Sequence, residues 1–152
     1  MAHILFVCTG NICRSPMAAG LLRKRLADEG MAERHKITSA GVYALDDRPA
    51  TQHAIDVMAE RDIDIADHIA HTLNAADMAE SDLILVMSQR HKVSIHSTWP
   101  QYDWKVHRLS EMAGKRRDVA DPYGDAIGAY RDRAEEIARY IDEGLEQILK
   151  LA

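Results

Sequence analysis

The sequence predicts a single α/β domain, spanning residues 1–152, with a four-stranded parallel sheet and helices on both of its faces. Two observations lead to this prediction. The chain has 152 residues, a length that suits one domain and is enough to bury a sizeable core. Short apolar runs also alternate along the chain with amphipathic helical patterns, which is typical of a parallel sheet covered on both sides. In such sheets, ligands bind at the carboxyl ends of the strands.

Four apolar runs predict the strands, which cover residues 3–7, 37–42, 83–87 and 105–109. The run at 83–87 is the least polar of the four. A strand that is buried on both faces has this composition, so we expect it near the centre of the sheet.

Helical periodicity marks the segments between the strands. Residues 17–29 and 50–61 carry their apolar side chains on one face, and residues 88–97 show a weaker pattern of the same kind. The clearest helix is the last one, because its apolar residues recur every three or four positions and form a stripe that can pack on the domain. That stripe consists of Ile127, Tyr130, Ala134, Ile137, Ile141, Leu145 and Ile148.

Composition narrows the class of protein. Hydrophobic residues make up 47% of the chain and charged residues 28%, which indicates a globular protein. The net charge of −5 argues against bulk binding of nucleic acid. No apolar run approaches the roughly 20 residues of a membrane span, and the N-terminus has no basic leader, so we expect a cytoplasmic protein that does not engage membranes. The two cysteines, Cys8 and Cys13, lie in one short stretch, which favours chemistry or redox over a disulfide scaffold.

The segment after the first predicted strand combines features of an anion site. A helix is predicted to follow it, and the N-terminus of a helix presents unpaired N–H groups that attract anions, phosphate above all. Gly10 allows the backbone to approach a ligand, and Arg14 offers a planar fork that matches phosphate oxygens. Pro16 fits the opening of a helix. Cys8 stands at the start of this segment, where a thiolate could attack phosphorus, although a free cysteine is often only a small buried apolar residue.

Other phosphate loops do not match this segment. It lacks the Gly-Lys-Ser/Thr ending of a nucleotide-binding loop, and it contains no GxGxxG sequence. The string from Val7 to Ala18, VCTGNICRSPMA, with its Cys-x5-Arg-Ser core, resembles the low-molecular-weight protein tyrosine phosphatases. The sequence Asp121-Pro122-Tyr123 is similar to the general-acid loop of that family. The resemblance also covers Ser39-Ala40-Gly41, the predicted strand near residues 82–87 and the last helix, and thus nearly the whole chain.

The resemblance implies a phosphatase that forms a phosphocysteine intermediate. Cys8 would be the nucleophile, Arg14 the phosphate clamp and Asp121 the general acid and base. Without the resemblance, Asp121-Pro122 would be interpreted as a simple turn. The remaining loop residues would bind phosphate through their backbone or shape the loop: Thr9, Gly10, Asn11, Ile12, Cys13 and Ser15.

Residues outside the loop also receive expected roles from the resemblance. Tyr123, Leu45 and Tyr43 would form the pocket wall, and a leucine at position 45 is typical of a bacterial group. Ser39 and His68 would support the loop from behind, although His68 could also be an ordinary surface histidine.

The redox role and the partners follow in the same way. Cys13 would trap Cys8 as a disulfide, unless it is only a packed thiol. The histidines show no metal-site pattern, so we expect neither a metal nor a cofactor. The expected partners are phosphotyrosine-containing proteins, met by a monomer or a weak dimer.

Three competing functions remain to be weighed. Arsenate reduction on this fold relays a disulfide through later cysteines, and none follows Cys13. A protein arginine phosphatase of the same fold is favoured by several stretches, including Asp118-Val119 with the Asp-Pro pair. That subgroup, however, is expected to carry Thr at the position of Ile12 and Phe at the position of Tyr123. A phosphopeptide-binding module without catalysis is disfavoured by the intact nucleophile, arginine and acid.

Overall fold

The computed structural model describes all residues, 1–152, and contains one parallel sheet with the strand order β2-β1-β3-β4. The strands are β1 (Ala2–Cys8), β2 (His35–Gly41), β3 (Leu83–Val86) and β4 (Val106–Arg108). The predicted four-stranded parallel sheet is therefore confirmed, and β3 lies in its interior as expected.

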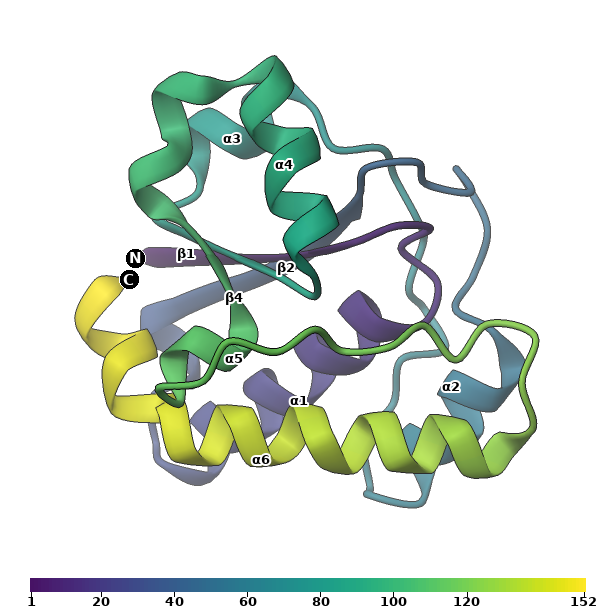
Figure 1. The fold of residues 1–152 in the computed structure, drawn as a ribbon. Coiled ribbons are helices and arrows are strands. Elements are labelled where there is room, and N and C mark those ends of the chain that lie inside the picture. Colours follow the sequence, from purple (N-terminus) through teal and green to yellow (C-terminus); the bar gives the residue numbers. More distant parts are fainter.

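Helices cover both faces of the sheet, as the sequence predicts (Figure 1). One face carries α1 (Arg14–Asp28), α2 (Gln52–Ala59), the short α5 (Leu109–Met112) and the long α6 (Ile127–Leu151). The other face carries α3 (Ala75–Glu80) and α4 (Gln89–Thr98). Two 3-10 segments, Ala32–Arg34 and Pro100–Lys105, complete the regular structure. None of these helices combines the length and the apolar character needed to cross a membrane.

The central strand β1 explains why the sheet is buried on both sides. Ile4 and Phe6 point into the core cluster beneath α1 and α6, whereas Leu5 and Val7 point into the smaller cluster beneath α3 and α4. All four side chains are completely buried. An uninterrupted apolar run is the expected sequence for such a strand, because successive side chains point to opposite faces.

The helix boundaries differ from the prediction at the functional end of the molecule. The first helix begins at Arg14 rather than at residue 17, so that the Arg14 side chain projects from its first turn. The helices α3 and α5 were not predicted, because six and four residues are too few for an apolar period to be recognised.

The strand order determines where a ligand can bind. The chain leaves β1 through α1 to reach β2 on one side, and it later returns to β3 on the other side of β1. The connections thus diverge above the carboxyl end of β1, which is the position where open α/β sheets bind their ligands. The loop that follows Cys8 occupies this position.

Candidate active site

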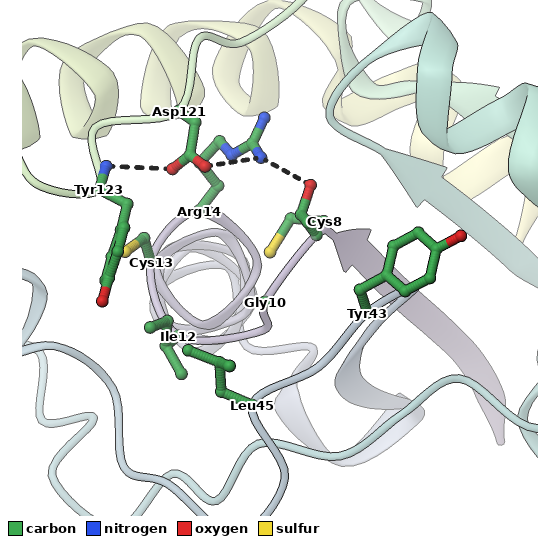
Figure 2. A pocket seen from close by; sticks show the side chains of 10 residues that line it. Cys8, Gly10, Ile12, Cys13, Arg14, Tyr43, Leu45, Asp121 and Tyr123 are labelled. Atoms are coloured by element: carbon green, nitrogen blue, oxygen red, sulfur yellow. Dashed lines mark hydrogen bonds and ion pairs between the residues drawn. The ribbon is translucent and has the colours of Figure 1, made fainter.

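A pocket of about 170 Å³ opens at the carboxyl end of β1 (Figure 2). Its residues come from the loop after β1, from the segment after β2 and from the segment before α6. The structure thereby brings together residues from three distant parts of the sequence, all of which the sequence had pointed to. The lining residues are Cys8, Thr9, Gly10, Ile12, Cys13, Arg14, Tyr43, Leu45, Asp121 and Tyr123.

The carbonyl groups of the loop point away from the pocket and are all engaged. The carbonyls of Cys8, Thr9 and Gly10 accept hydrogen bonds from the N–H groups of residues 42, 43 and 45, at 3.0, 3.0 and 3.1 Å. The Ile12 carbonyl accepts from the backbone N–H of Thr51 at 2.9 Å. The segment after β2 therefore holds the loop by its outer edge.

The N–H groups of the same loop have no partner inside the protein. None of the backbone N–H groups of residues 9–15 donates a hydrogen bond to another protein group. Helix α1 begins directly after the loop, with no side-chain cap and no acidic residue in its first turn. A ring of free N–H groups at a helix N-terminus is an anion site, because both the donors and the helix dipole attract negative charge.

Asn11 fixes the shape of the loop. Its side chain is completely buried, and its Nδ2 donates to the hydroxyls of Ser15 (2.8 Å) and Ser39 (2.9 Å), while its Oδ1 accepts from the backbone N–H of His71 (3.0 Å). Asn11 is also the left-handed residue of the loop, with φ 59°. The left-handed conformation of the loop is therefore at Asn11 and not at Gly10, and asparagine is a residue type that tolerates this region well.

Two further contacts complete the support. The Nε2 of His68 donates to the Asn11 carbonyl at 2.6 Å, and burial lowers the pKa of His68. Ser15 Oγ lies 2.9 Å from Cys8 Sγ, and it already accepts from Asn11, so its own hydrogen is free to point at the sulfur. The structure places Ser39 and His68 behind the loop, each in contact with Asn11, where the sequence led us to expect them.

Arg14 is held from two sides at the edge of the pocket (Figure 2). Its Nη1 donates to the carbonyl of Val119 at 2.8 Å, and its Nη2 lies 3.4 Å from Thr9 Oγ1 and 3.6 Å from the Asp121 carboxylate. The Nε of Arg14 is buried and has no partner in the protein. One guanidinium donor thus stays available to an anion in the pocket.

Asp121 and the aromatic wall belong to the mouth of the pocket. One carboxylate oxygen of Asp121 accepts from the backbone N–H of Tyr123 at 3.1 Å, so the Asp-Pro sequence does form a turn, and that turn points the carboxylate at Arg14. Tyr123 and Tyr43 are 58% and 75% exposed, which leaves their rings free to contact a ligand. Leu45 lies on the floor side beside Ile12 (Figure 2).

Cys13 borders the pocket but also packs toward α6. Its Sγ lies 3.4 Å from Tyr130 Oη and 3.6 Å from Thr51 Oγ1, and burial raises the pKa of its thiol. Burial likewise raises the pKa of Tyr130 to about 12. Cys13 is therefore a neutral, packed thiol at the edge of the site.

Three residues of the site were not assigned a role from the sequence. A Cβ at Gly41 would lie 2.5 Å from the Thr9 carbonyl oxygen, so only glycine allows β2 to approach the loop. Val119 contributes only a backbone carbonyl. His91, at 2% exposure, contacts Thr9 from α4. The Ser-x-x-His sequence at the start of α4 is a capping signal that could have drawn attention to His91.

Comparison with known proteins identifies the family of the chain. A profile of the low molecular weight phosphotyrosine protein phosphatase family matches residues 3–151. A probable low molecular weight protein-tyrosine-phosphatase, EpsP, from Ralstonia nicotianae is 42% identical over 97% of this chain and 97% of its own length. A protein-arginine-phosphatase from Bacillus subtilis is 38% identical over 95% of this chain and 97% of its own length.

A solved structure of a protein from the same family has the same fold as this chain. The low molecular weight protein tyrosine phosphatase from T. tengcongensis superimposes with a TM-score of 0.91 at 40% identity, covering 97% of this chain and 99% of that chain. The chain belongs to the low molecular weight phosphotyrosine protein phosphatase family and is a phosphoric monoester hydrolase.

Proposed function

We propose that this protein is a protein-tyrosine phosphatase that hydrolyses phosphotyrosine in proteins through a phosphocysteine on Cys8, with Arg14 as phosphate clamp and Asp121 as general acid and base. The substrates are phosphotyrosine-containing proteins, and residues 1–152 act as one catalytic domain in the cytoplasm, as a monomer or a weak dimer. No cofactor takes part in the reaction.

The observation that carries the proposal is the orientation of the loop peptides. Every N–H group from residue 9 to residue 15 lacks a protein partner, whereas the carbonyls of the loop are engaged on the outside. This arrangement suits a tetrahedral dianion, whose oxygens need several donors at once. The unpartnered Nε of Arg14 adds a charged donor to the same space.

The first chemical step transfers the phosphoryl group to the protein. The Cys8 thiolate attacks phosphorus, an S–P bond forms, and the P–O bond to the tyrosine oxygen breaks with its electron pair going to that oxygen. Asp121 in its protonated form supplies the proton to the leaving oxygen.

The second step releases phosphate. The Asp121 carboxylate removes a proton from a water molecule, whose oxygen attacks phosphorus while the S–P bond breaks and its electron pair returns to Cys8. The Ser15 hydroxyl, whose Oγ lies 2.9 Å from Cys8 Sγ, donates to the departing thiolate and stabilises it. Asp121 thus acts as acid in the first step and as base in the second.

The walls of the pocket support phosphotyrosine as the substrate. Ile12 and Leu45 offer only apolar contact to the group that carries the phosphoryl, and the exposed ring of Tyr123 forms a wall to one side of them (Figure 2). A flat aromatic ring can pack against these apolar walls. Phosphoserine is too short to bring its phosphorus to Cys8 while its backbone stays outside.

Phosphoarginine is the competing substrate, because the relative from Bacillus subtilis is a protein-arginine-phosphatase. Purified enzyme should therefore be offered matched peptides that contain phosphotyrosine, phosphoarginine or phosphoserine. We expect the highest kcat/KM for phosphotyrosine, a low one for phosphoarginine and almost none for phosphoserine. A higher kcat/KM for phosphoarginine would contradict the proposed substrate.

The covalent mechanism has its own test. Cys8→Ser should abolish turnover of an aryl phosphate and still bind vanadate, because the loop stays intact while the alcohol is a poor nucleophile. Arg14→Lys should also be inactive, since a point charge cannot replace the planar fork. Activity near that of the wild type in Cys8→Ser would refute the phosphocysteine intermediate.

A further inference from the structure

The tautomer of the buried His91 is determined by the backbone. Its Nδ1 lies 3.1 Å from the backbone nitrogen of Ser88, which can only donate a hydrogen. Nδ1 must therefore be the acceptor, and the ring hydrogen of the neutral imidazole must sit on Nε2. Nε2 lies 2.8 Å from Thr9 Oγ1, so His91 donates to the Thr9 hydroxyl.

The Thr9 hydroxyl consequently accepts from two donors. It receives the Nε2–H of His91 and, at 3.4 Å, the Nη2–H of Arg14, a group without any acceptor capacity. The hydroxyl hydrogen of Thr9 can go to neither partner. Because Thr9 also lines the pocket, that hydrogen remains as a donor for an oxygen of the bound group.

We propose that His91 is a positioning residue of the phosphatase reaction: it orients the Thr9 hydroxyl so that the oxygen holds Arg14 and the hydrogen faces the transferred phosphoryl group. The inference rests on the proposed function, since it assumes that a phosphoryl group occupies this pocket. It adds a path from the first turn of α4 to the clamp, across the carboxyl ends of β1 and β3.

Burial, more than the surrounding charges, keeps the His91 ring neutral. Arg14 and Arg90 are the positive groups that face it, and Asp118 and Asp121 are the negative ones. Burial, with the help of Arg14, lowers the pKa of His91 to about 4. The Nε2–H donor is therefore in place throughout the neutral pH range in which a phosphatase acts.

Two substitutions separate positioning from a purely structural role. His91 also caps α4 through Ser88, so a loss of activity alone would not be diagnostic. The amide of His91→Asn reaches the position of Nδ1, so it can keep the cap and lose the donor to Thr9. The longer amide of His91→Gln reaches the position of Nε2, so it can keep the donor to Thr9 at the expense of the cap.

The measurements are kcat/KM for an aryl phosphate, the inhibition constant of inorganic phosphate and the thermal midpoint of unfolding. We expect His91→Asn to lose about tenfold in kcat/KM and in phosphate affinity, the order of magnitude of one hydrogen bond in the site. His91→Gln should restore most of that loss even where its thermal midpoint is lower. The opposite pattern, with activity following the thermal midpoint, would overturn the proposal.

Thr9→Val supplies the second arm, because it removes the hydroxyl and keeps the shape. If His91 acts through Thr9, the double variant Thr9→Val with His91→Asn should be no worse than Thr9→Val alone. Additive losses would refute the path through Thr9, even if both histidine variants prove unstable. Failure of the wild type to hydrolyse aryl phosphates would instead refute the proposed function, and phosphate binding would still report on His91.

Discussion

Acidification should destabilise this protein partly through His91, and the size of that contribution can be calculated. The pKa of His91 is lowered from 6.5 to about 4, first by burial and then by the positive charge of Arg14. The unfolded chain therefore takes up a proton on this residue at a higher pH than the folded protein does. The contribution of His91 to stability is fully present above its pKa in the unfolded chain, and it is lost as the pH falls toward its pKa in the folded protein.

The loss follows from the two protonation equilibria. Between about pH 7 and about pH 4.5, His91 alone should remove about 2 kcal/mol from the free energy of unfolding. His3, His68 and His107 also have lowered pKa values, mainly because of burial, and they act in the same direction. The total loss of the wild type should therefore exceed the His91 contribution.

Urea unfolding at both pH values, on the wild type and on His91→Gln, isolates the contribution. The variant has no ionisable group at this position, so its loss of stability on acidification should be about 2 kcal/mol smaller than that of the wild type. Subtracting the loss of the variant from the loss of the wild type cancels the contributions of the other histidines, which both proteins share. Equal losses would show that His91 titrates alike in the folded and unfolded states, which would refute its burial as a neutral donor.

Three further results are expected. Asp121→Asn should lower kcat by about 10²–10³-fold, within the span of general acid–base catalysis, and the loss should shrink for aryl phosphates with very acidic leaving groups; a constant loss across a leaving-group series would indicate a structural role. Cys13→Ser should keep its activity but recover poorly from mild peroxide after thiol treatment, because Cys8 then has no neighbouring thiol to form a disulfide with; full recovery would exclude protection by this pair. Ile12→Thr should shift the ratio of kcat/KM from phosphotyrosine toward phosphoarginine peptides by about 10–200-fold, the scale of one pocket contact, and an unchanged ratio would remove Ile12 as the selecting residue.

The sheet and the loop could be predicted because their signals are local. The apolar run of β1, the string that begins at Cys8 and the periodicity of α6 each lie within one continuous stretch of sequence. Asp121 was found for the same reason, since its neighbours Pro122 and Tyr123 form a short motif. The boundaries were less exact: α1 begins at Arg14, because the loop itself turns into the helix.

The residues that escaped prediction act through contacts between distant segments. His91 and Thr9 are 82 residues apart in the sequence. Only the pairing of β1 with β3 brings α4 next to the loop. Val119 acts through its carbonyl, which no side-chain pattern can reveal. Gly41 matters because of the space that it leaves empty beside Thr9, a property of the register between β1 and β2.

The engaged carbonyls of the loop have a consequence for ligand binding and for the stability of the protein as a whole. The backbone of residues 8–12 is anchored by segments 42–45 and 51, and by His68, so phosphate should meet a preorganised receptor and need to order little chain on binding. A ligand of this kind binds the folded state alone, since the unfolded chain has no such ring of donors. Inorganic phosphate at about 100 times its dissociation constant should therefore stabilise the entire domain by about 2.7 kcal/mol. The enzyme's own product would thus act as a general stabiliser of its fold, and melting temperatures would rise with the logarithm of the phosphate concentration once that concentration exceeds the dissociation constant of the loop.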